Sequence, residues 1–260
     1  MAPRSRRAGE VRPGVSAFTA PFEPGSTAKL FTAASLLRLG RVDSTASVYG
    51  ERGKWTYHVT PTSARTRTLT DDHAEEGNLT LARAIQVSSN IATAKFAQML
   101  RPEEQYEGLR DFGFGSPTGI EFPAEASGRL PRPHLWQSGY SSQNLAIGYE
   151  LGVTAIQLAA AYGAIANDGV LLAPSIVREV RDPSGRPVWR HQPEAVRRVV
   201  TPEVAARLRG FLREAAGDSG TGGRVQLRNV RMSGETGTTG DLGGGGHQTG
   251  KFTASFAGNF

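Results

Sequence analysis

The chain has 260 residues, of which 38% are hydrophobic, which suits one large domain or two small ones built around a packed core. Its formal net charge of +6 comes from arginines scattered along the sequence, a distribution that argues against nucleic-acid binding. The absence of cysteine excludes disulfides, thiol catalysis and Cys-ligated metals, and no two of the five histidines stand at helical ligand spacing. We therefore expect a globular protein that uses no metal and no cofactor.

The sequence shows neither a membrane span nor an export signal. Its longest uncharged stretches, such as Leu151 to Asn167, are interrupted by polar residues and fall short of the roughly 20 apolar residues that a span needs. Four arginines lie before residue 15, but no apolar run follows them as it would in a signal peptide. We expect residues 1–14 to form a disordered basic N-terminus.

The first predicted helix starts at or near Ser26. Apolar residues recur at helical spacing from Leu30 to Leu37, and Gly40 ends the run. The polar segment 41–78 is typical of loops, with one hairpin around Trp55 to Val59. Residues 79–87 and 91–100 then form two predicted helices, separated by Ser-Ser-Asn, residue types that commonly interrupt a helix.

The second half of the chain alternates helices, turns and strands. A short helix and then a Gly/Pro-rich connection are expected within residues 101–133, and an apolar helix at 153–166. A hairpin is predicted between residues 176 and 190 across Asp182-Pro-Ser-Gly185. Thr201 followed by Pro202 is typical of a helix start, and this helix should run to about Ala216. Two strand-like segments, near 230–238 and 252–258, complete the predicted elements.

Ser26 and Lys29 form a Ser-x-x-Lys tetrad at the predicted helix start. Lysine occurs only four times, and only Lys29 has a serine three residues before it. On a helix this spacing places both side chains on one face, where a poorly solvated amine can lose its proton and accept that of the serine. Amide groups at the helix N-terminus can also bind a developing oxyanion. An N-cap serine beside an exposed lysine is the simpler reading of the tetrad taken alone.

Two later segments could complete such a site. The Ser88 hydroxyl and the Asn90 amide could relay a proton and hold a substrate amide, although Ser-x-Asn recurs at Ser142 and either triplet alone fits a cap or a turn. Residues 235–238, Glu-Thr-Gly-Thr, lie on a predicted strand whose glycine lets a peptide-like substrate pair along the edge. An ordinary hairpin strand containing glycine is the alternative for this segment.

The order and spacing of the three segments strengthen the signal. The chain resembles the transpeptidase domain of class B penicillin-binding proteins, the septal or elongation D,D-transpeptidases of the bacterial cell wall. The resemblance extends from about residue 15 to the end. It is carried by Glu23-Pro-Gly-Ser-Thr-Ala-Lys29, Gln86-Val-Ser-Ser-Asn-Ile91, Phe112-Gly-Phe-Gly-Ser-Pro-Thr-Gly-Ile120, Ala146-Ile-Gly148, Val153-Thr-Ala-Ile-Gln-Leu-Ala159, Tyr162-Gly-Ala-Ile-Ala-Asn-Asp-Gly169 and Phe252-Thr-Ala-Ser-Phe-Ala257.

The resemblance implies an α/β fold of the α+β type, in which a central antiparallel sheet is flanked by helices, as in serine β-lactamases. It implies that Ser26 attacks the penultimate D-Ala carbonyl of a peptidoglycan stem peptide, that Lys29 takes its proton, and that β-lactams trap Ser26. Ser88 and Asn90 would assist proton transfer to the leaving D-Ala and hold the donor amide.

The substrate-binding strand would be Glu235, Thr236, Gly237 and Thr238, with the amides of Ser26 and Thr238 as the oxyanion hole. The parent protein would work with membrane-bound cell-wall or division partners in the cell envelope, on the extracytoplasmic face of the inner membrane.

The third motif departs from the family pattern. The family has Lys-Thr-Gly, and Glu235 occupies the position of that lysine. An attraction for the substrate carboxylate thereby becomes a repulsion, each of about a few kcal/mol at about 4 Å and an effective dielectric near 20. A loss on the order of 10³-fold in acylation would follow. Three accounts stand: a neutral Glu235 of raised pKa, a substitute cation such as Lys251, or a domain of strongly impaired turnover, which we favour.

The resemblance also predicts what lies beyond the printed sequence. The family carries a membrane anchor and a non-catalytic domain before the transpeptidase domain, and a further strand and helix after the point where Phe260 falls. We therefore expect residues 15–260 to be a transpeptidase domain truncated at both ends, with an uncovered sheet edge and low stability.

Two alternatives to an active transpeptidase remain. A serine β-lactamase shares the three motifs, but no water-activating residue can be placed in this sequence. A non-catalytic penicillin-binding-like module with a structural or partner-binding role is supported by Glu235, and the intact Ser26, Lys29, Ser88 and Asn90 oppose it.

Overall fold

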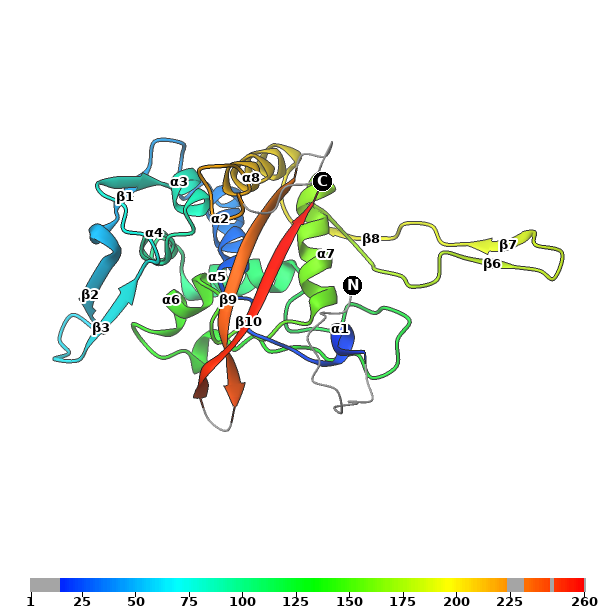
Figure 1. Ribbon diagram of the computed structural model, residues 1–260, viewed down its shortest axis with the longest axis horizontal. Helices are drawn as coiled ribbons and strands as arrows, with labels where there is room; N and C mark the ends of the chain where they lie inside the picture. Colours follow the sequence, from blue (N-terminus) through cyan, green and yellow to red (C-terminus); the bar gives the residue numbers. More distant parts are fainter. Residues whose placement is uncertain (1–14, 224–231, 244–245, 260) are drawn as a thin grey trace.

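A long antiparallel hairpin formed late in the chain lies across a body of helices (Figure 1). The computed structural model describes residues 15–223, 232–243 and 246–259, and within residues 240–251 it describes the backbone alone. The expected disordered N-terminus, residues 1–14, therefore lies outside the described residues, as does the start of the segment predicted as a strand near residue 230.

The helical elements follow the chain from one end to the other. Several begin at a side chain that accepts a hydrogen bond from the first turn, as Thr80, Ser89, Thr154 and Thr201 do. The α-helices are α1 (Ser16–Thr19), α2 (Lys29–Arg38), α3 (Leu81–Gln86), α4 (Asn90–Ala97), α5 (Pro102–Asp111), α6 (Ser141–Ala146), α7 (Ala155–Ala166) and α8 (Pro202–Ala215), and the 3-10 turns are η1 (Gly25–Ala28), η2 (Glu51–Gly53) and η3 (Pro133–Leu135).

The strands pair two by two, and every pair is antiparallel. The pairs are β1 (Ser47–Tyr49) with β4 (Asn78–Thr80), β2 (Lys54–His58) with β3 (Thr66–Thr70), β5 (Val170–Leu172) with β8 (Ala195–Arg198), β6 (Glu179–Arg181) with β7 (Pro187–Arg190), and β9 (Ser233–Gly243) with β10 (Gly246–Asn259). The β6–β7 hairpin projects away from the body (Figure 1).

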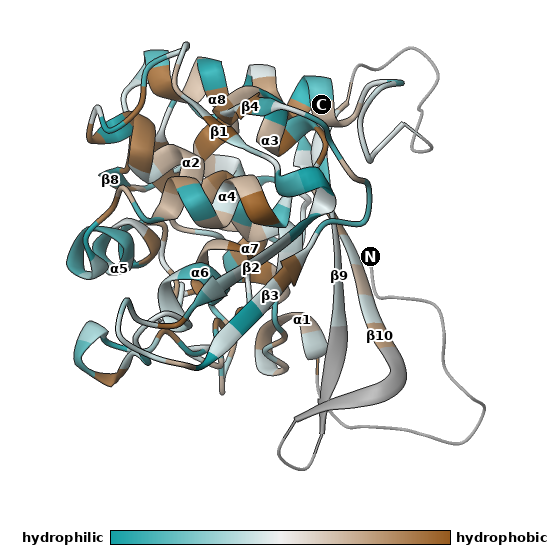
Figure 2. Cartoon of the chain, turned by 90° about the vertical axis from the view of Figure 1, so that its left-hand side faces the viewer, coloured by the Kyte–Doolittle hydropathy of each residue, from teal (hydrophilic) through white to brown (hydrophobic). Residues whose placement is uncertain are grey.

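Helix α2 runs through the centre of the hydrophobic core. Every residue from Lys29 to Leu37 is buried, so the helix has no solvent-facing stripe. The Phe31 ring lies 4.8 Å from Phe112, 4.9 Å from Phe114 and 5.6 Å from Tyr162, measured between ring centroids. The helices around it mix hydrophobic and hydrophilic residues along their lengths, as an amphipathic covering does (Figure 2). The helix that begins at Lys29, the last residue of the Ser-x-x-Lys tetrad, is therefore packed on all sides.

The β9–β10 hairpin is placed by helices on its flanks and by the start of η1. Helix α8 lies against β9 and helix α7 against β10, while η1 lies under β9. The Thr239 hydroxyl donates to the Glu23 carbonyl over 2.9 Å, which ties the strand to the segment before η1. The fold is thus the predicted one, with helices flanking an antiparallel sheet that has two strands among the described residues.

Most predicted elements are present with shifted ends. The first turn after Pro24 is a 3-10 turn, and the α-helix proper begins at Lys29. The hairpin around Trp55 is β2–β3, and the predicted interruption at residues 88–90 separates α3 from α4. The helix expected from residue 79 instead begins at Leu81, because Leu79 pairs with Val48 in the β1–β4 bridge. Helix α6 and the β5–β8 pair were not predicted.

Candidate active site

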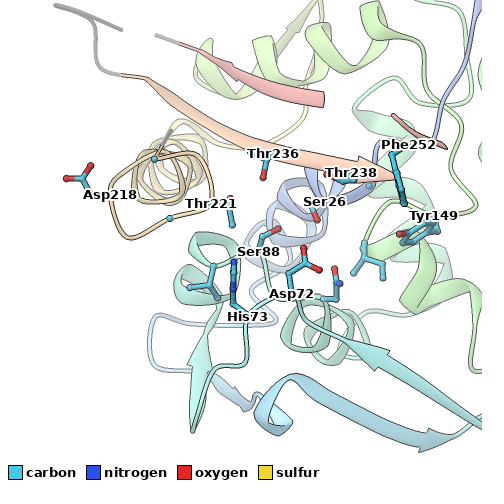
Figure 3. A pocket seen from close by; sticks show the side chains of 16 residues that line it. Ser26, Asp72, His73, Ser88, Tyr149, Asp218, Thr221, Thr236, Thr238 and Phe252 are labelled. Carbon is cyan, nitrogen blue, oxygen red and sulfur yellow. The ribbon is translucent and has the colours of Figure 1, made fainter. Parts of the chain in front are cut away.

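A cavity of about 860 Å³ opens between β9 and the ends of the helices beneath it (Figure 3). Five of the eight residues singled out in the sequence line it, although they come from segments more than 200 residues apart: Ser26, Ser88, Asn90, Thr236 and Thr238. The other three, Lys29, Glu235 and Gly237, are not among the lining residues. The structure therefore brings the three sequence motifs to one place.

Ser26 lies in the 3-10 turn η1, at the point where the chain enters the central helix. Its side chain is half-buried and lines the cavity, while the flanking Gly25 and Thr27 are buried. Gly25 has φ of +56°, a conformation that glycine adopts without strain, and a side chain there would meet Thr239 at 2.7 Å. The backbone before Ser26 is thereby shaped to pass close under β9.

Lys29 is one turn further along and is 1% exposed. Its backbone amide donates to the Ser26 carbonyl, and its amine donates to the backbone carbonyl and, over 3.0 Å, to the hydroxyl of Ser88. Burial lowers the pKa of Lys29 to about 8, although the attraction of Glu235 and of two nearby aspartates opposes that shift. A lysine in this state gives up its proton far more readily than an exposed one.

Ser88 and Asn90 are fixed by an aspartate on the neighbouring hairpin. Asp71, which follows β3, accepts a hydrogen bond from the Ser89 hydroxyl over 2.6 Å and another from the Ile91 amide over 3.0 Å. Ser88 itself has φ of +54°, an uncommon conformation for a residue with a side chain, and the Asn90 amide donates to the Thr70 carbonyl over 2.9 Å. The start of α4 is therefore held against the end of β3.

Glu235 lies on β9 with its carboxyl group directed under the strand. It is 1% exposed, and neither carboxylate oxygen has a hydrogen-bond partner of good geometry. Burial raises the pKa of Glu235 to about 7, while the nearby Lys29 charge and the Ser88 side chain act in the opposite direction. The charge of this carboxylate also raises the pKa of Tyr162, after the larger effect of burial. Glu235, where the third motif departs from the family pattern, thus lies near Lys29, the candidate base for Ser26.

The alternation of side chains along β9 explains which of its residues line the cavity. Thr236 and Thr238 face the cavity, whereas Gly237 lies over η1 and Glu235 lies near Lys29, an alternation expected for a strand. A side chain at Gly237 would meet the Pro24 carbonyl at 2.7 Å and the Thr27 methyl at 3.1 Å. Glycine at this position therefore lets the strand lie directly over the Ser26 turn.

Sequence reasoning missed several residues of the cavity. Asp72, His73 and Tyr149 line it, and Asp71 supports it from behind. The aspartates and His73 lie in a stretch without apolar periodicity, where no motif marked them. Tyr149 directly follows a stretch that carried the family resemblance, so proximity to Gly148 was the one available signal.

The arrangement supplies a hydroxyl, a buried amine and a second hydroxyl in hydrogen-bonding contact with that amine. These are the parts of a serine nucleophile with a lysine base. Among the side chains that the structure describes, no group of three His, Cys, Asp or Glu is positioned to hold a metal. The Lys251 side chain, one of the substitute cations considered for the third motif, lies outside the described residues.

Three comparisons relate this chain to known proteins. A family model described as the penicillin binding protein transpeptidase domain matches residues 6–260. Among curated proteins, the chain is 34% identical over 241 residues to penicillin-binding protein PbpB of Mycolicibacterium smegmatis, covering 86% of this chain and 34% of that protein. It is 30% identical over 240 residues to the probable peptidoglycan D,D-transpeptidase PbpC of Pseudomonas aeruginosa, covering 92% of this chain and 39% of PbpC. The chain spans about a third of the length of these relatives.

Solved structures show the same similarity in three dimensions. The transpeptidase domain of Burkholderia pseudomallei penicillin-binding protein 3 has a TM-score of 0.79 and 32% identity, over 93% of this chain and 68% of that one. Penicillin-binding protein 3 of Mycobacterium tuberculosis complexed with ampicillin has a TM-score of 0.80 and 30% identity, over 96% of this chain and 55% of that one. In the part of this chain that the structure describes, no helix is long and apolar enough to cross a membrane.

Proposed function

Because this chain belongs to the penicillin-binding protein transpeptidase family, we propose that it is a peptidoglycan D,D-transpeptidase domain that acts through a Ser26 acyl-enzyme. The observation that supports this proposal most strongly is the buried Lys29 amine, hydrogen-bonded to Ser88 beneath a cavity that Ser26 lines. Residues 15–260 would form the domain, its substrates would be peptidoglycan stem peptides, and β-lactams would bind covalently at Ser26. The parent protein would act in the cell envelope beside membrane-bound cell-wall or division proteins.

The acylation step requires Lys29 in its neutral form. Burial lowers the pKa of this amine to about 8, so a useful fraction is neutral near neutral pH. Neutral Lys29 accepts the Ser26 proton as the serine oxygen bonds to the penultimate D-Ala carbonyl carbon. The proton then passes through Ser88, which already contacts the Lys29 amine, to the nitrogen of the leaving D-Ala. An amine on the stem peptide of a second peptidoglycan strand then attacks the acyl-enzyme, which forms the cross-link and releases Ser26.

The remaining parts of the site hold the donor. The backbone amides of Ser26 and Thr238 would bind the oxyanion, because one lies in the 3-10 turn that leads into the buried helix and the other lies on the strand above it. Asn90 lies on the cavity wall near Ser88 and would hold the donor amide. Thr236 and Thr238 present their hydroxyls from β9, where an extended peptide can pair along the strand.

Glu235 would impair this chemistry in two ways. Its negative charge raises the pKa of Lys29 and so keeps the base protonated. It also replaces the cation that would attract a substrate carboxylate. Burial in turn raises the pKa of Glu235 to about 7, so that the carboxyl is partly neutral near neutral pH and the impairment is incomplete. We propose a slow enzyme and not an inert one.

A non-catalytic module that keeps the fold is the second candidate, and the buried acidic Glu235 is the observation that favours it. Prolonged incubation of the purified chain with a fluorescent penicillin, read by gel and intact mass, separates the two. Ser26→Ala should abolish the adduct, whereas Ser142→Ala should retain it, because the Ser142 hydroxyl donates to Gln105 and is not among the described residues lining the cavity. A folded chain that forms no adduct even as Glu235→Lys would favour the non-catalytic module.

A further inference from the structure

The described walls of the Ser26 cavity carry no lysine or arginine. The charged or titratable side chains among the described lining residues, apart from Tyr149, are Asp72, His73 and Asp218. Asp72 is exposed on the loop between β3 and β4, and its charge acts on the candidate base, because it raises the pKa of the buried Lys29. A ligand that enters this cavity therefore meets a negative charge on the wall beside Ser88, as Figure 3 shows for the Asp72 side chain.

Among the described residues beneath the cavity, the one buried amine, that of Lys29, lies beside a carboxyl group that offsets its charge when ionised. Lys29 and Glu235 lie close enough for each to shift the pKa of the other, and together they carry one amine and one carboxyl group. When the pair holds a single proton, its summed charge is zero, whichever of the two groups carries that proton. Asp71 accepts hydrogen bonds from the Ser89 hydroxyl and from the Ile91 amide in the first turn of α4, so its charge is partly compensated there.

Among the described residues, the cavity wall therefore offers a ligand carboxylate two acidic side chains and no lysine or arginine to pair with. Taking an ionised carboxylate out of water is unfavourable unless it is paired, whereas an amide or ester of the same shape sheds its water at much lower cost. Thr236 and Thr238 can still donate hydroxyl hydrogen bonds to such a neutral group. The wall that would position the donor is thus present, but it favours a neutral terminal group over a carboxylate.

We propose that this site selects acyl donors and β-lactams whose terminal group is uncharged, a carboxamide or an ester, over the same molecules bearing a free carboxylate. The inference rests on the proposed function, since it requires Ser26 to form an acyl-enzyme. It identifies the substrate class as peptides whose C-terminal carboxylate has been masked. A reaction that converts that carboxylate into an amide must then supply the substrate.

The test uses a matched pair of D-alanyl thioesters that differ in one group, thioglycolate and thioglycolamide. In both, the Ser26 oxygen bonds to the D-alanyl carbonyl carbon, the C–S bond breaks, and the Ser26 proton passes through Lys29 to the leaving thiolate. Water then hydrolyses the acyl-enzyme, and the released thiol is measured. Second-order rate constants for enzymatic thiol release are divided by the spontaneous hydrolysis rate of each thioester, which removes their intrinsic difference in reactivity.

We expect the parent chain to react with the amide at least about tenfold faster than with the acid. This is the rate effect of one charge–charge interaction at about 10 Å and an effective dielectric near 20. Glu235→Gln removes the charge with little change of shape and should lower the ratio of the amide rate constant to the acid rate constant. Glu235→Lys should bring this ratio below one. Equal rates, or a faster acid, in the parent would overturn the inference and leave the proposed function intact. No reaction with either thioester, in a folded parent that penicillin also fails to label, would overturn both.

Discussion

Replacing Glu235 by lysine should restore acylation by carboxylate-bearing β-lactams. In the parent, the Glu235 carboxylate holds a proton on Lys29, because its charge raises the pKa of that amine. A cation at the same position would instead lower the pKa of Lys29 further below about 8, and more of the base would be neutral at pH 7. The same cation would attract the carboxylate of the incoming penicillin.

The magnitude follows from Coulomb's law for a unit charge at an assumed separation. A unit charge about 6 Å away contributes about 2–3 kcal/mol at an effective dielectric near 20. Glu235→Gln removes the repulsion and should raise the second-order acylation rate constant by up to about 10²-fold at a pH where the carboxyl is fully ionised, since 1.36 kcal/mol corresponds to a factor of ten. Glu235→Lys adds attraction and should raise it about 10³-fold or more. The longer lysine must fit a site in which Glu235 is 1% exposed, which limits the second gain.

The assay is stopped-time labelling with fluorescent penicillin over a range of concentrations, with intact mass to confirm one adduct per chain. Thermal melting of each variant shows whether the fold is retained. We expect the second-order acylation rate constant to be highest for Glu235→Lys, lower for Glu235→Gln and lowest for the parent chain. If the three rate constants agree within a factor of two while all melting temperatures are similar, then the charge at position 235 does not control acylation, and our reasoning about Lys29 fails.

Four further predictions concern the support of α4, the geometry of β9, and the pH dependence of stability and of acylation. Asp71→Ala should lower the free energy of unfolding by about 1–3 kcal/mol and slow acylation, because the start of α4 loses two hydrogen bonds; unchanged melting would contradict this. Gly237→Ala should lower the melting temperature and the labelling rate, since its Cβ would meet backbone and side-chain atoms at 2.5–3.1 Å, whereas Gly163→Ala, with nothing within 4 Å, should leave labelling unchanged. Folded Glu235 keeps its proton up to about pH 7, because burial raises its pKa above the usual range. As the pH rises from 5 to 8, the free energy of unfolding of the parent chain should therefore fall by about 1–3 kcal/mol relative to that of Glu235→Gln, measured by denaturant titration. A difference that stays constant with pH would argue against a raised pKa. Acylation of the parent should rise with pH through about 8 as Lys29 loses its proton, and a flat profile would exclude that amine as the base.

The helices were predictable from sequence where local signals agreed. Thr201 and Pro202 mark the start of α8 by capping and by a fixed backbone angle, and both operate within one turn. Helix α2 was found from its apolar spacing, although it is buried on every side. Its first turn differs from the expectation, because Gly25 at positive φ and the close approach of β9 shape the backbone there.

The unpredicted elements depend on contacts between distant segments. β1 and β4 have three residues each, and Val48 finds its partner Leu79 thirty-one residues later, so no local pattern announces the pair. Helix α6 has six residues and little apolar periodicity. It is anchored where Gln105 from α5 donates to the Ser142 carbonyl over 2.9 Å.

The candidate site was predictable as a set of motifs but not as an electrostatic environment. Ser26, Lys29 and Ser88 were named from their order and spacing. That the Lys29 amine contacts Ser88, and that Glu235 has no hydrogen-bond partner of good geometry, required the folded chain. Asp71 was missed because its role is to hold α4, and a lone aspartate in a polar loop carries no such signal.

The most direct test of the central proposal is to map the site of β-lactam attachment. The parent chain and Glu235→Lys are incubated with benzylpenicillin, digested, and analysed by mass spectrometry beside Ser26→Ala. The account predicts a single adduct on the peptide that contains Ser26, slow in the parent and fast in Glu235→Lys, and none in Ser26→Ala. An adduct on another residue, or no adduct in either folded chain at saturating penicillin, would contradict it.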